Sequence, residues 1–317
     1  ERPLPVHTTG RGAMEAAICN LLNPGDEIVA CCNGKFGELW GKLAESYRIV
    51  VHRVATDWNH DVRPADVARA LHDHPKSRAV TMTFGDTSTG VLNDVAAVCA
   101  VAREHDALVL VDGVSSIGGM PFAFDAWGVD AAVVATQKCL MSAPGLSFVA
   151  MSDRAWAANG RATIPRNYWD FAAIRKSVTK LRPDTPGTPP VHIILQVAEA
   201  LRMMHEEGLD AVYRRHQQMA DLARRGVTQL GCTVQCPQLR QRSTALTAVV
   251  PPAGVAPQAI RAELKSRGIL TAAGLGDFET SAFRIGHMGD IRPADVQRTL
   301  DALADALHAL TLGTKRA

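Results

Sequence analysis

The sequence predicts an α/β fold, in which a mostly parallel sheet of about seven strands is flanked by helices and followed by a smaller C-terminal α+β domain. Three observations point to this fold. Apolar strands and amphipathic helices alternate along the first half of the chain. The strands are continuous apolar runs, which is typical of strands buried on both faces of a parallel sheet. A proline-rich segment then interrupts the alternation at 182–190.

The first half contains the elements of the predicted sheet. Apolar residues at helical spacing mark helices at 12–22, 36–47, 64–74 and 94–105. Apolar runs bounded by turn residues mark strands at 26–32, 49–54, 78–84, 107–112, 131–136 and 145–151. Ligands of such sheets bind outside the carboxyl ends of the strands, so the residues that follow each strand are the candidate site residues.

The segment RPDTPGTPP at 182–190 is the clearest break in the chain, because its four prolines exclude both a helix and a central strand. Two long helices are predicted after it, at 191–208 and 210–231. The rest of the pattern fits a small α+β domain, with segments at 243–252, 257–268, 282–289 and 292–310. We therefore expect a large domain over 1–208, which includes the connecting helix, and a small domain over 209–317.

Composition narrows the function classes. The chain has 317 residues, of which 47 % are apolar, enough for a sizeable core. It has 34 Lys and Arg against 32 Asp and Glu, and these are scattered, so nucleic acid is not an expected partner. The longest apolar runs, of about six to eight residues, are far shorter than the ~20 residues that span a bilayer. No membrane segment is expected.

The seven cysteines indicate a protein with reduced thiols. Their number is odd and most lie in apolar stretches, which suits a reducing cytoplasm. Cys232 and Cys236 are the one close pair with a spacing typical of metal ligands, and no second pair or nearby histidine completes a site. No metal site is therefore expected.

Two strand ends carry groups of opposite charge. Asp112 ends the apolar strand ALVLVD, and Lys138 follows the strand AAVVAT. Taken alone, Asp112 could equally be a turn or helix-capping residue, and Lys138 a solvated surface lysine. Together they would present a carboxylate and an amine at neighbouring strand ends. A lysine partly removed from water has a lowered pKa and can act as a neutral nucleophile toward aldehydes.

Pyridoxal phosphate is a cofactor that needs both groups. Its aldehyde forms a Schiff base with a lysine, and a carboxylate keeps its ring nitrogen protonated. Its phosphate needs backbone N–H groups at a helix N-terminus, which the segment TTGRGAME at 8–15 supplies. Phe36 could stack on the ring or be a core aromatic residue. Thr87 or Ser88 in TFGDTSTG could donate a hydrogen bond to the phenolic oxygen.

Seven motifs carry a family resemblance. Along the chain they are GAMEAA, NGKFGE, DTSTGVLND, VDGVSSIGG, TQKCLMSAPG, TPGTPPVHIILQVAEAL and FRIGHMG. In this order and at this spacing they resemble the fold-type I, class V pyridoxal phosphate aminotransferases of the alanine–glyoxylate and serine–pyruvate group. Each motif alone is a weak signal, whereas the seven together are a strong one, and they cover essentially the whole chain.

The resemblance implies roles for individual residues. Lys138 would form the Schiff base, Asp112 would pair with the pyridinium, and Arg284 in FRIGHMG would bind the α-carboxylate of the substrate. A planar guanidinium suits that last role, because it donates two parallel hydrogen bonds to a carboxylate. The further cofactor contacts implied are Phe36 on the ring, Thr87 near the phenolic oxygen, Thr9, Gly10, Arg11 and Gln137 at the phosphate, and Thr185 and Thr188 at the phosphate of a partner subunit. The active sites would then be shared across a homodimer.

The reaction implied is a ping-pong amino transfer from a small amino acid, similar to alanine or serine, to a 2-oxo acid such as glyoxylate or pyruvate. The chain departs from the family pattern in two respects. Arg11 replaces a smaller or neutral residue, and the N-terminal arm that usually precedes the first glycine-rich turn is expected to be absent. His287, beside Arg284, could contact the substrate or cap the strand end.

Other functions stay open at this point. RIGHMG and the KCL…PG pattern also resemble pyridoxamine–pyruvate and 2-aminoethylphosphonate–pyruvate transaminases. A lyase or a cysteine desulfurase would use the same cofactor, and a desulfurase would need Cys232 or Cys236 as an exposed thiol. A non-catalytic scaffold or a dinucleotide-binding domain is a further alternative, although no G-x-G-x-x-G follows the first strand.

Overall fold

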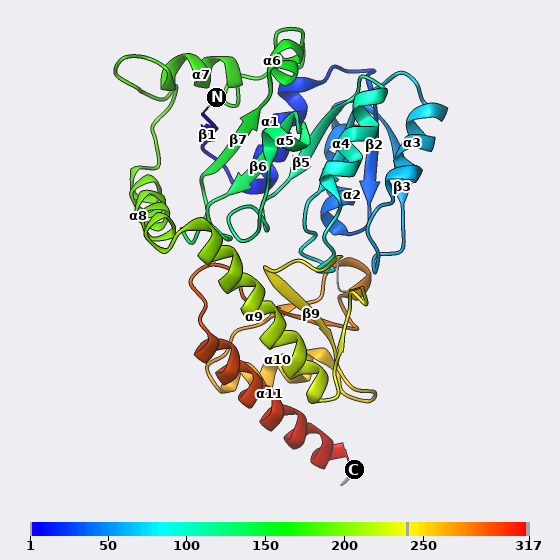
Figure 1. Cartoon of the computed structure of the whole chain (residues 1–317), viewed down its shortest axis with the longest axis vertical. Coiled ribbons are helices and arrows are strands. Elements are labelled where there is room, and N and C mark those ends of the chain that lie inside the picture. Colours follow the sequence, from blue (N-terminus) through cyan, green and yellow to red (C-terminus); the bar gives the residue numbers. More distant parts are fainter. Residues whose placement is uncertain (1, 239–240, 315–317) are drawn as a thin grey trace.

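The larger of two sheets lies in the upper half of the molecule as drawn in Figure 1, with helices packed around it. The computed structural model describes residues 2–238 and 241–314. The large sheet has seven strands in the order β1-β7-β6-β5-β4-β2-β3. Its strands are β1 (Leu4–Val6), β2 (Glu27–Cys32), β3 (Val50–Ala55), β4 (Ser77–Thr83), β5 (Leu108–Asp112), β6 (Ala131–Ala135) and β7 (Ser147–Met151).

The centre of this sheet is parallel and one edge is antiparallel. β2 pairs in parallel with β3 and β4, and the parallel pairing continues through β5 to β6. β7 then runs antiparallel to β6, and β1 antiparallel to β7. The sequence prediction does not include β1, because three residues are too few to show a periodic pattern.

Helices pack on both faces of the sheet, so the predicted α/β fold is confirmed. They are α1 (Gly10–Leu21), α2 (Lys35–Ser46), α3 (Pro64–Asp73), α4 (Val95–Glu104), α5 (Phe124–Trp127), α6 (Asp153–Asn159) and α7 (Phe171–Val178). On one face, α1 and α2 bury Met14, Ile18 and Trp40. On the other, α3 and α4 bury Leu71 and Val98. Among the described helices, none combines the length and the apolar character that crossing a membrane requires.

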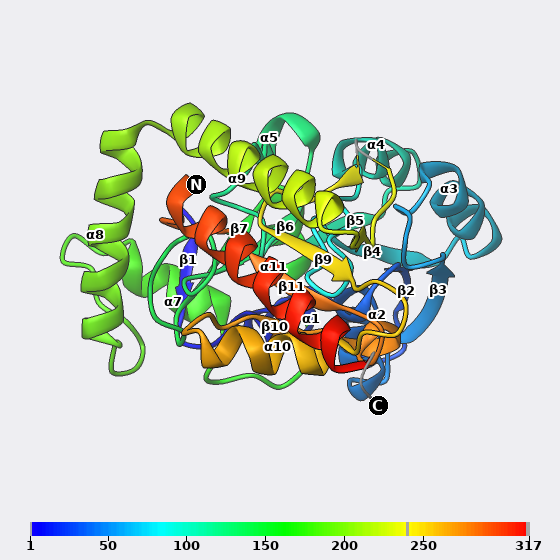
Figure 2. The same ribbon diagram turned by 90° about the horizontal axis from the view of Figure 1, so that it is seen from below.

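The second half of the chain adds a smaller, antiparallel sheet in the order β10-β11-β9-β8. Its elements and the helices around it are α8 (Val191–Glu207), α9 (Leu209–Gln229), β8 (Thr233–Val234), β9 (Leu246–Val250), α10 (Pro257–Ser266), β10 (Ala272–Ala273), the short 3-10 helix η2 (Gly276–Phe278), β11 (Phe283–Gly286) and α11 (Pro293–Thr314). Helices α9, α11 and α10 lie side by side against this sheet (Figure 2).

This second unit has a hydrophobic core of its own. The core includes Met219 of α9, Ile260 of α10, Phe283 of β11 and Leu303 of α11. Because α9 also packs on α8, the domain boundary after residue 208 stays a prediction.

The second unit lies against the loops that follow the parallel strands. Ser243 donates its backbone N–H to the carbonyl of Gly90, beyond the end of β4, at 2.8 Å. Thr244 donates its hydroxyl to the carbonyl of Gly119, beyond the end of β5, at 3.2 Å. The carboxyl ends of β4 and β5 therefore face the smaller sheet, which is where the sequence analysis places the site.

Candidate active site

Asp112 is the last residue of β5, and its carboxylate is buried. One carboxylate oxygen accepts a hydrogen bond from the backbone N–H of Val114 at 2.8 Å. The pKa of Asp112 rises to about 7, mainly through burial; the Asp86 carboxylate adds to the rise, while the Val114 bond and the charge of Lys138 oppose it. A buried carboxyl group in this setting becomes a stable anion only when a cation or further donors reach it.

Lys138 lies in the turn that follows β6, the neighbour of β5 in the sheet. The hydroxyl of Thr136 fixes this turn by donating to the carbonyl of Leu146 at 3.0 Å. Burial lowers the pKa of Lys138, the positive charge of Arg284 lowers it further, and the charge of Asp112 opposes both. The fold therefore brings both Asp112 and Arg284 within electrostatic reach of Lys138, while the catalytic and substrate-binding roles of the three residues stay predictions.

Arg284 reaches the site from β11 of the smaller sheet. Its Nε donates to the carbonyl of Ala273 at 2.7 Å, and its Nη1 to the carbonyl of Thr87 at 2.8 Å. Burial lowers the pKa of this guanidinium, which stays a cation at neutral pH. In the described part of the chain Nη2 has no hydrogen-bond partner, so one edge of the guanidinium is left for a ligand.

The loop after β4 caps helix α2 through Asp86, a residue that the sequence analysis did not select. Its fully buried carboxylate accepts from the backbone N–H groups of Phe36 at 3.0 Å and Ser88 at 2.8 Å. The Ser88 hydroxyl accepts from the backbone N–H of Lys35 at 3.0 Å. A Cβ at Gly34 would lie 2.3 Å from the Asp86 carboxyl carbon, so the helix can begin here only with glycine. An aspartate within TFGDTSTG is the one signal that could have suggested this cap.

The two residues proposed for the phenolic oxygen have different surroundings. Ser88 is engaged in the cap of α2. Thr87 is buried, and its hydroxyl hydrogen-bonds the hydroxyl of Ser115, in the loop after Asp112. Phe36 is half-buried in the first turn of α2, beside the loop after β4, where Asp86 accepts its backbone N–H. The geometry thus favours Thr87 over Ser88, while the roles of Thr87 and Phe36 toward a cofactor stay predictions.

The first turn of α1 lies next to the Asp112 turn, because a Cβ at Gly10 would lie 2.6 Å from Cγ2 of Val114. Thr9 precedes the helix without a side-chain capping hydrogen bond, and both Thr9 and Arg11 are exposed. The leading N–H groups of α1 are therefore free to bind an anion. Oε1 of Gln137, in the turn after β6, is buried and has no hydrogen-bond partner among the described residues.

Thr185 and Thr188 lie between α7 and α8, outside the group formed by Asp112, Lys138 and Arg284. The hydroxyl of Thr185 donates to the carbonyl of Gly187 at 2.6 Å, and Thr188 is exposed. Thr185 also lines a cavity of about 80 Å³ with His7 and Tyr168. Their role toward a partner's cofactor stays a prediction.

Comparison with known proteins settles the family. The family model described as aminotransferase class-V matches residues 5–292. This chain belongs to that family. The predicted family is thereby confirmed, and the enzyme is an aminotransferase of class V.

Individual relatives cover nearly the whole chain. The soluble hydrogenase small subunit of Synechococcus sp. is 38 % identical over 95 % of this chain and 79 % of that protein. L-aspartate–glyoxylate aminotransferase of Paracoccus denitrificans is 36 % identical over 90 % of this chain and 73 % of that protein. The crystal structure of pyridoxamine–pyruvate aminotransferase from Mesorhizobium loti has a TM-score of 0.92 at 30 % identity, covering 98 % of this chain and 80 % of that one.

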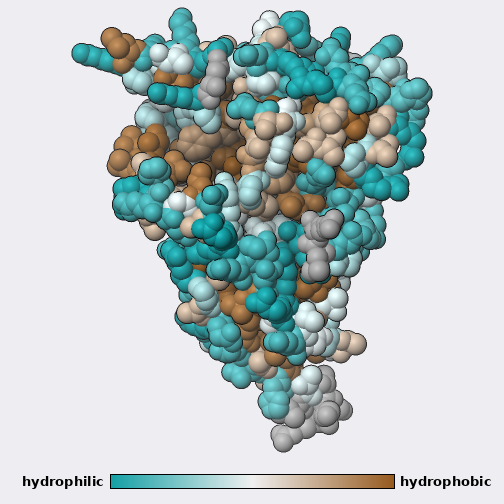
Figure 3. All heavy atoms as spheres, in the orientation of Figure 1, coloured by the Kyte–Doolittle hydropathy of each residue, from teal (hydrophilic) through white to brown (hydrophobic). Residues whose placement is uncertain are grey.

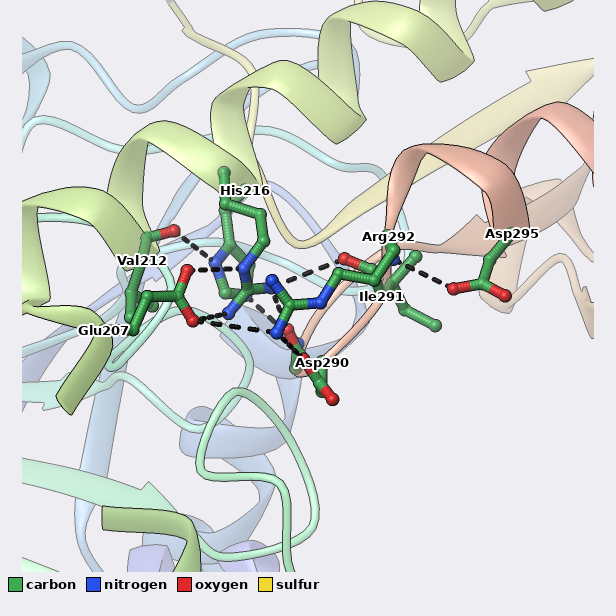
Figure 4. A network of polar contacts seen from close by, with 9 residues as sticks. Glu207, Val212, His216, Asp290, Ile291, Arg292 and Asp295 are labelled. Atoms are coloured by element: carbon green, nitrogen blue, oxygen red, sulfur yellow. Dashed lines mark hydrogen bonds and ion pairs between the residues drawn. The ribbon is translucent and has the colours of Figure 1, made fainter. Parts of the chain in front are cut away.

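A network of ion pairs holds the loop after β11 of this aminotransferase (Figure 4). Nε and Nη2 of the buried Arg215, on α9, donate to both carboxylate oxygens of Glu207 at 2.7 and 2.9 Å. Arg292 lies 3.9 Å from the same carboxylate and also pairs with Asp290. A bidentate pair of this kind fixes geometry as well as charge. Sequence analysis did not find it, because the two partners lie on different helices, separated by the Gly208 break.

The network extends to the Lys138 turn through Gly289. Nη1 of Arg215 donates to the Gly289 carbonyl, and the Gly289 N–H donates to Nε2 of His216 at 3.0 Å. A Cβ at Gly289 would lie 3.2 Å from Cγ of Met141 and 4.0 Å from the Lys138 carbonyl. The small unit therefore supports the backbone that carries Lys138.

His287 binds strands together rather than facing the site. It is fully buried; its Nδ1 donates to the carbonyl of Thr244 at 2.8 Å, and its Nε2 accepts from the hydroxyl of Thr247 at 2.9 Å. Burial is the main cause that lowers its pKa to about 3. Of the two expectations for this residue, the strand-end role is the one that the structure shows.

The raised pKa of Asp112 predicts a pH-dependent stability of the cofactor-free chain. Its carboxyl group moves from an ordinary 3.8 to about 7 on folding, so this group lowers the free energy of unfolding progressively as the pH rises between those values. Asp112→Asn removes that cost. We expect the cofactor-free variant to melt at a higher temperature than the wild type at pH 8, with a smaller gap at pH 5.

The control is Asp125→Asn, which changes an exposed carboxylate in α5. Thermal unfolding followed by circular dichroism at the two pH values gives the comparison. A variant at residue 112 that is less stable than the wild type at pH 8 would contradict the assignment of Asp112 as an uncompensated buried acid.

Proposed function

We propose that this chain uses pyridoxal phosphate to move an amino group from a small amino acid, similar to alanine or serine, to a 2-oxo acid such as glyoxylate or pyruvate. The observation that carries the proposal is the grouping of Asp112, Lys138 and Arg284 at the strand ends. The family implies the cofactor, and the relative from Paracoccus denitrificans is named for a reaction with glyoxylate.

The residues of the site fit this cofactor. Asp112 has a buried carboxylate with one N–H donor, which suits a protonated ring nitrogen as its missing cation. The first turn of α1, at Thr9 and Gly10, has no side-chain cap and suits the phosphate. Gln137 is the further residue that the family resemblance assigns to the phosphate, to which its side-chain Nε2 would donate. When bound, pyridoxal phosphate supplies an electron sink for the breaking bond at the α-carbon.

Lys138 would move the proton. Its pKa is lowered by burial and by the charge of Arg284, so a larger fraction of its amine is neutral near pH 7 than in water. Nζ can then accept the proton from the α-carbon of the amino donor and release it again as general acid. Asp112 would stay anionic once a protonated nitrogen lies beside it, which keeps the positive charge where electrons accumulate.

Arg284 would orient the substrate. With Nε and Nη1 bonded to the carbonyls of Ala273 and Thr87, the guanidinium cannot rotate freely. Its remaining edge would take the α-carboxylate. A fixed carboxylate fixes the α-carbon and therefore selects which of its bonds is aligned for cleavage.

The alternatives make different demands on the same residues. If pyridoxamine were the amino donor, Arg284 would have no donor carboxylate to bind. A solved relative is named for that reaction. A desulfurase would need an accessible thiolate. Cys232 and Cys236 are buried, and burial raises both pKa values, that of Cys232 to about 11, which argues against it. The unpaired, buried cysteines fit the cytoplasm that we propose as the location.

We also propose a homodimer. Apolar surface gathers beside α8 in Figure 3. The exposed apolar side chains on this helix are Val191, Leu195, Leu201 and Met203. Val191 and Leu195, four residues apart, share one face of the helix, and exposed apolar side chains gathered in this way are typical of a surface that another chain covers. Thr185 and Thr188 directly precede this helix, in the position expected for residues that reach a partner's site.

The first experiment replaces the lysine. Lys138→Ala should lower amino transfer by at least about 10²-fold, because the proton carrier is lost. It should also abolish the covalent fixation of pyridoxal phosphate by borohydride, read as a mass increase on the peptide that contains residue 138. Lys265→Ala, in an exposed position on α10, is the control and should retain both properties. Fixation that survives in Lys138→Ala refutes the assignment.

The second experiment separates donors by their charge. Arg284→Ala should reduce kcat/KM for alanine, serine and aspartate by about 10- to 100-fold, as expected for the loss of a charge-assisted hydrogen bond. A donor without an α-carboxylate, such as pyridoxamine, should be affected far less. Equal losses for both kinds of donor would remove Arg284 from its substrate role and leave it a structural residue.

The third experiment tests the dimer. Leu195, 66 % exposed on α8, is changed to Asp, and Leu270, 81 % exposed on the small unit, is changed to Asp as the control. Light scattering should report about twice 34.0 kDa for the wild type and for Leu270→Asp, and a single chain for Leu195→Asp. A monomeric wild type at micromolar concentration would contradict the proposal.

A further inference from the structure

Three side chains with metal-binding atoms meet at one edge of the large sheet. Glu27 begins β2, His52 lies on the neighbouring edge strand β3, and His74 directly follows α3. One ligand atom from each of the three residues lies within 4.8 Å of the others. Within residues 2–238 and 241–314 no other group of three His, Cys, Asp or Glu side chains meets this description. We propose that these residues bind a divalent transition-metal ion of the Zn²⁺ type.

The distances are close to those of a bound ion. Nε2 of His52 lies 2.8 Å from Oε2 of Glu27. The rings of His52 and His74 are stacked, with centroids 3.4 Å apart and planes 8° from parallel. Ligand atoms about 2.1 Å from a tetrahedral Zn²⁺ are separated by about 3.4 Å. The ion would enter by rotation of the three side chains, which turns the two rings out of their stack so that one lone pair of each points at it.

The backbone holds the three residues in place. His52 is the register partner of Val29 in the parallel pair β2–β3, so Glu27, two residues before Val29, lies on the same face of the sheet as His52. His74 is fixed at the end of α3, where its N–H donates to the carbonyl of Ala70 at 3.0 Å. Helix α3 packs on both β2 and β3. A site that is already assembled binds an ion without a large ordering cost.

The donor set selects the class of ion. Two imidazoles and one carboxylate suit Zn²⁺ and its neighbours in the first transition row, whereas Mg²⁺ and Ca²⁺ prefer oxygen ligands alone. In the metal-free state Nε2 of His52 carries the hydrogen that it shares with Glu27. For the ion to bind there, the proton would move to Nδ1 of the same ring by exchange with solvent, so that the imidazole stays neutral and the freed Nε2 lone pair forms the bond to the ion. Three protein ligands leave a fourth position for water.

The site is accessible and separate from the catalytic group. The side chains of His52 and Glu27 are 20 % and 26 % exposed. His52 and His74 also line a surface groove of about 1040 Å³. Glu27 lies at the amino end of its strand, whereas Asp112 lies at the carboxyl end of a strand in the same parallel sheet. Metal binding should therefore stabilise the fold and leave amino transfer unchanged.

The experiment titrates ZnCl₂ into cofactor-loaded enzyme from which the affinity tag, free pyridoxal phosphate and trace metals have been removed. Calorimetry should show one Zn²⁺ per chain, and the melting temperature should rise with ZnCl₂ but not with MgCl₂. Turnover of the wild type should be the same with and without zinc. The variants His74→Ala and Glu27→Gln should each weaken binding by at least about 10-fold. Glu27→Gln keeps the shape of the side chain, which guards against a misfolded variant.

His72→Ala is the matched control, because His72 is exposed on the same helix and outside the cluster. It should bind Zn²⁺ as tightly as the wild type. The proposal is overturned if the wild type shows no saturable binding, or if Glu27→Gln and His74→Ala bind as tightly as His72→Ala. Both results can be obtained whatever the amino donor of the enzyme proves to be.

Discussion

The pairing of β5 with β6 is the constraint on which the active site depends. The two strands run in parallel as neighbours, with Asp112 opposite Val133, so the carboxylate and the Lys138 turn leave the sheet at the same edge. A slip of one residue in either strand would turn these side chains to opposite faces. Because the edge is buried, each ionised form is disfavoured there, and the pKa of Asp112 rises while that of Lys138 falls. The pairing and burial of these two strands therefore determine where Asp112 and Lys138 lie and in which direction their pKa values shift.

Backbone groups of two loops, at Thr87 and at Gly289, help to hold the residues of the candidate site in place. The carbonyl of Thr87 accepts a hydrogen bond from Arg284, so the residue proposed to bind the substrate from the small sheet is held by a loop of the large sheet. Gly289 packs on the Lys138 turn and is fixed by Arg215. The two sheets therefore cannot separate without disturbing both Arg284 and the turn that carries Lys138.

The large sheet and the residues at its strand ends could be predicted from the sequence, because each buried strand is a continuous apolar run with a clear end. Continuous apolar runs that end in Asp112 or just before Lys138 show both the strand and its end, and seven ordered motifs add Arg284. Asp86 as a helix cap, the Glu207–Arg215 pair and the Glu27–His52–His74 group have no such signal. Their members are far apart in sequence, and only the packing of strands and helices brings them together. The roles proposed for Thr185 and Thr188 involve a partner subunit, and they stay predictions.

The position of Arg284 has a consequence for the timing of the reaction. In the free enzyme its positive charge helps to keep Lys138 a weak base. An incoming acid that neutralises the guanidinium would remove that repulsion, and the affinity of the amine for a proton would increase at the moment when an α-hydrogen is presented to it. The enzyme would then be most basic with the correct partner seated. With amines that lack an acid group the repulsion by Arg284 would remain, and the pKa of Lys138 would stay lowered.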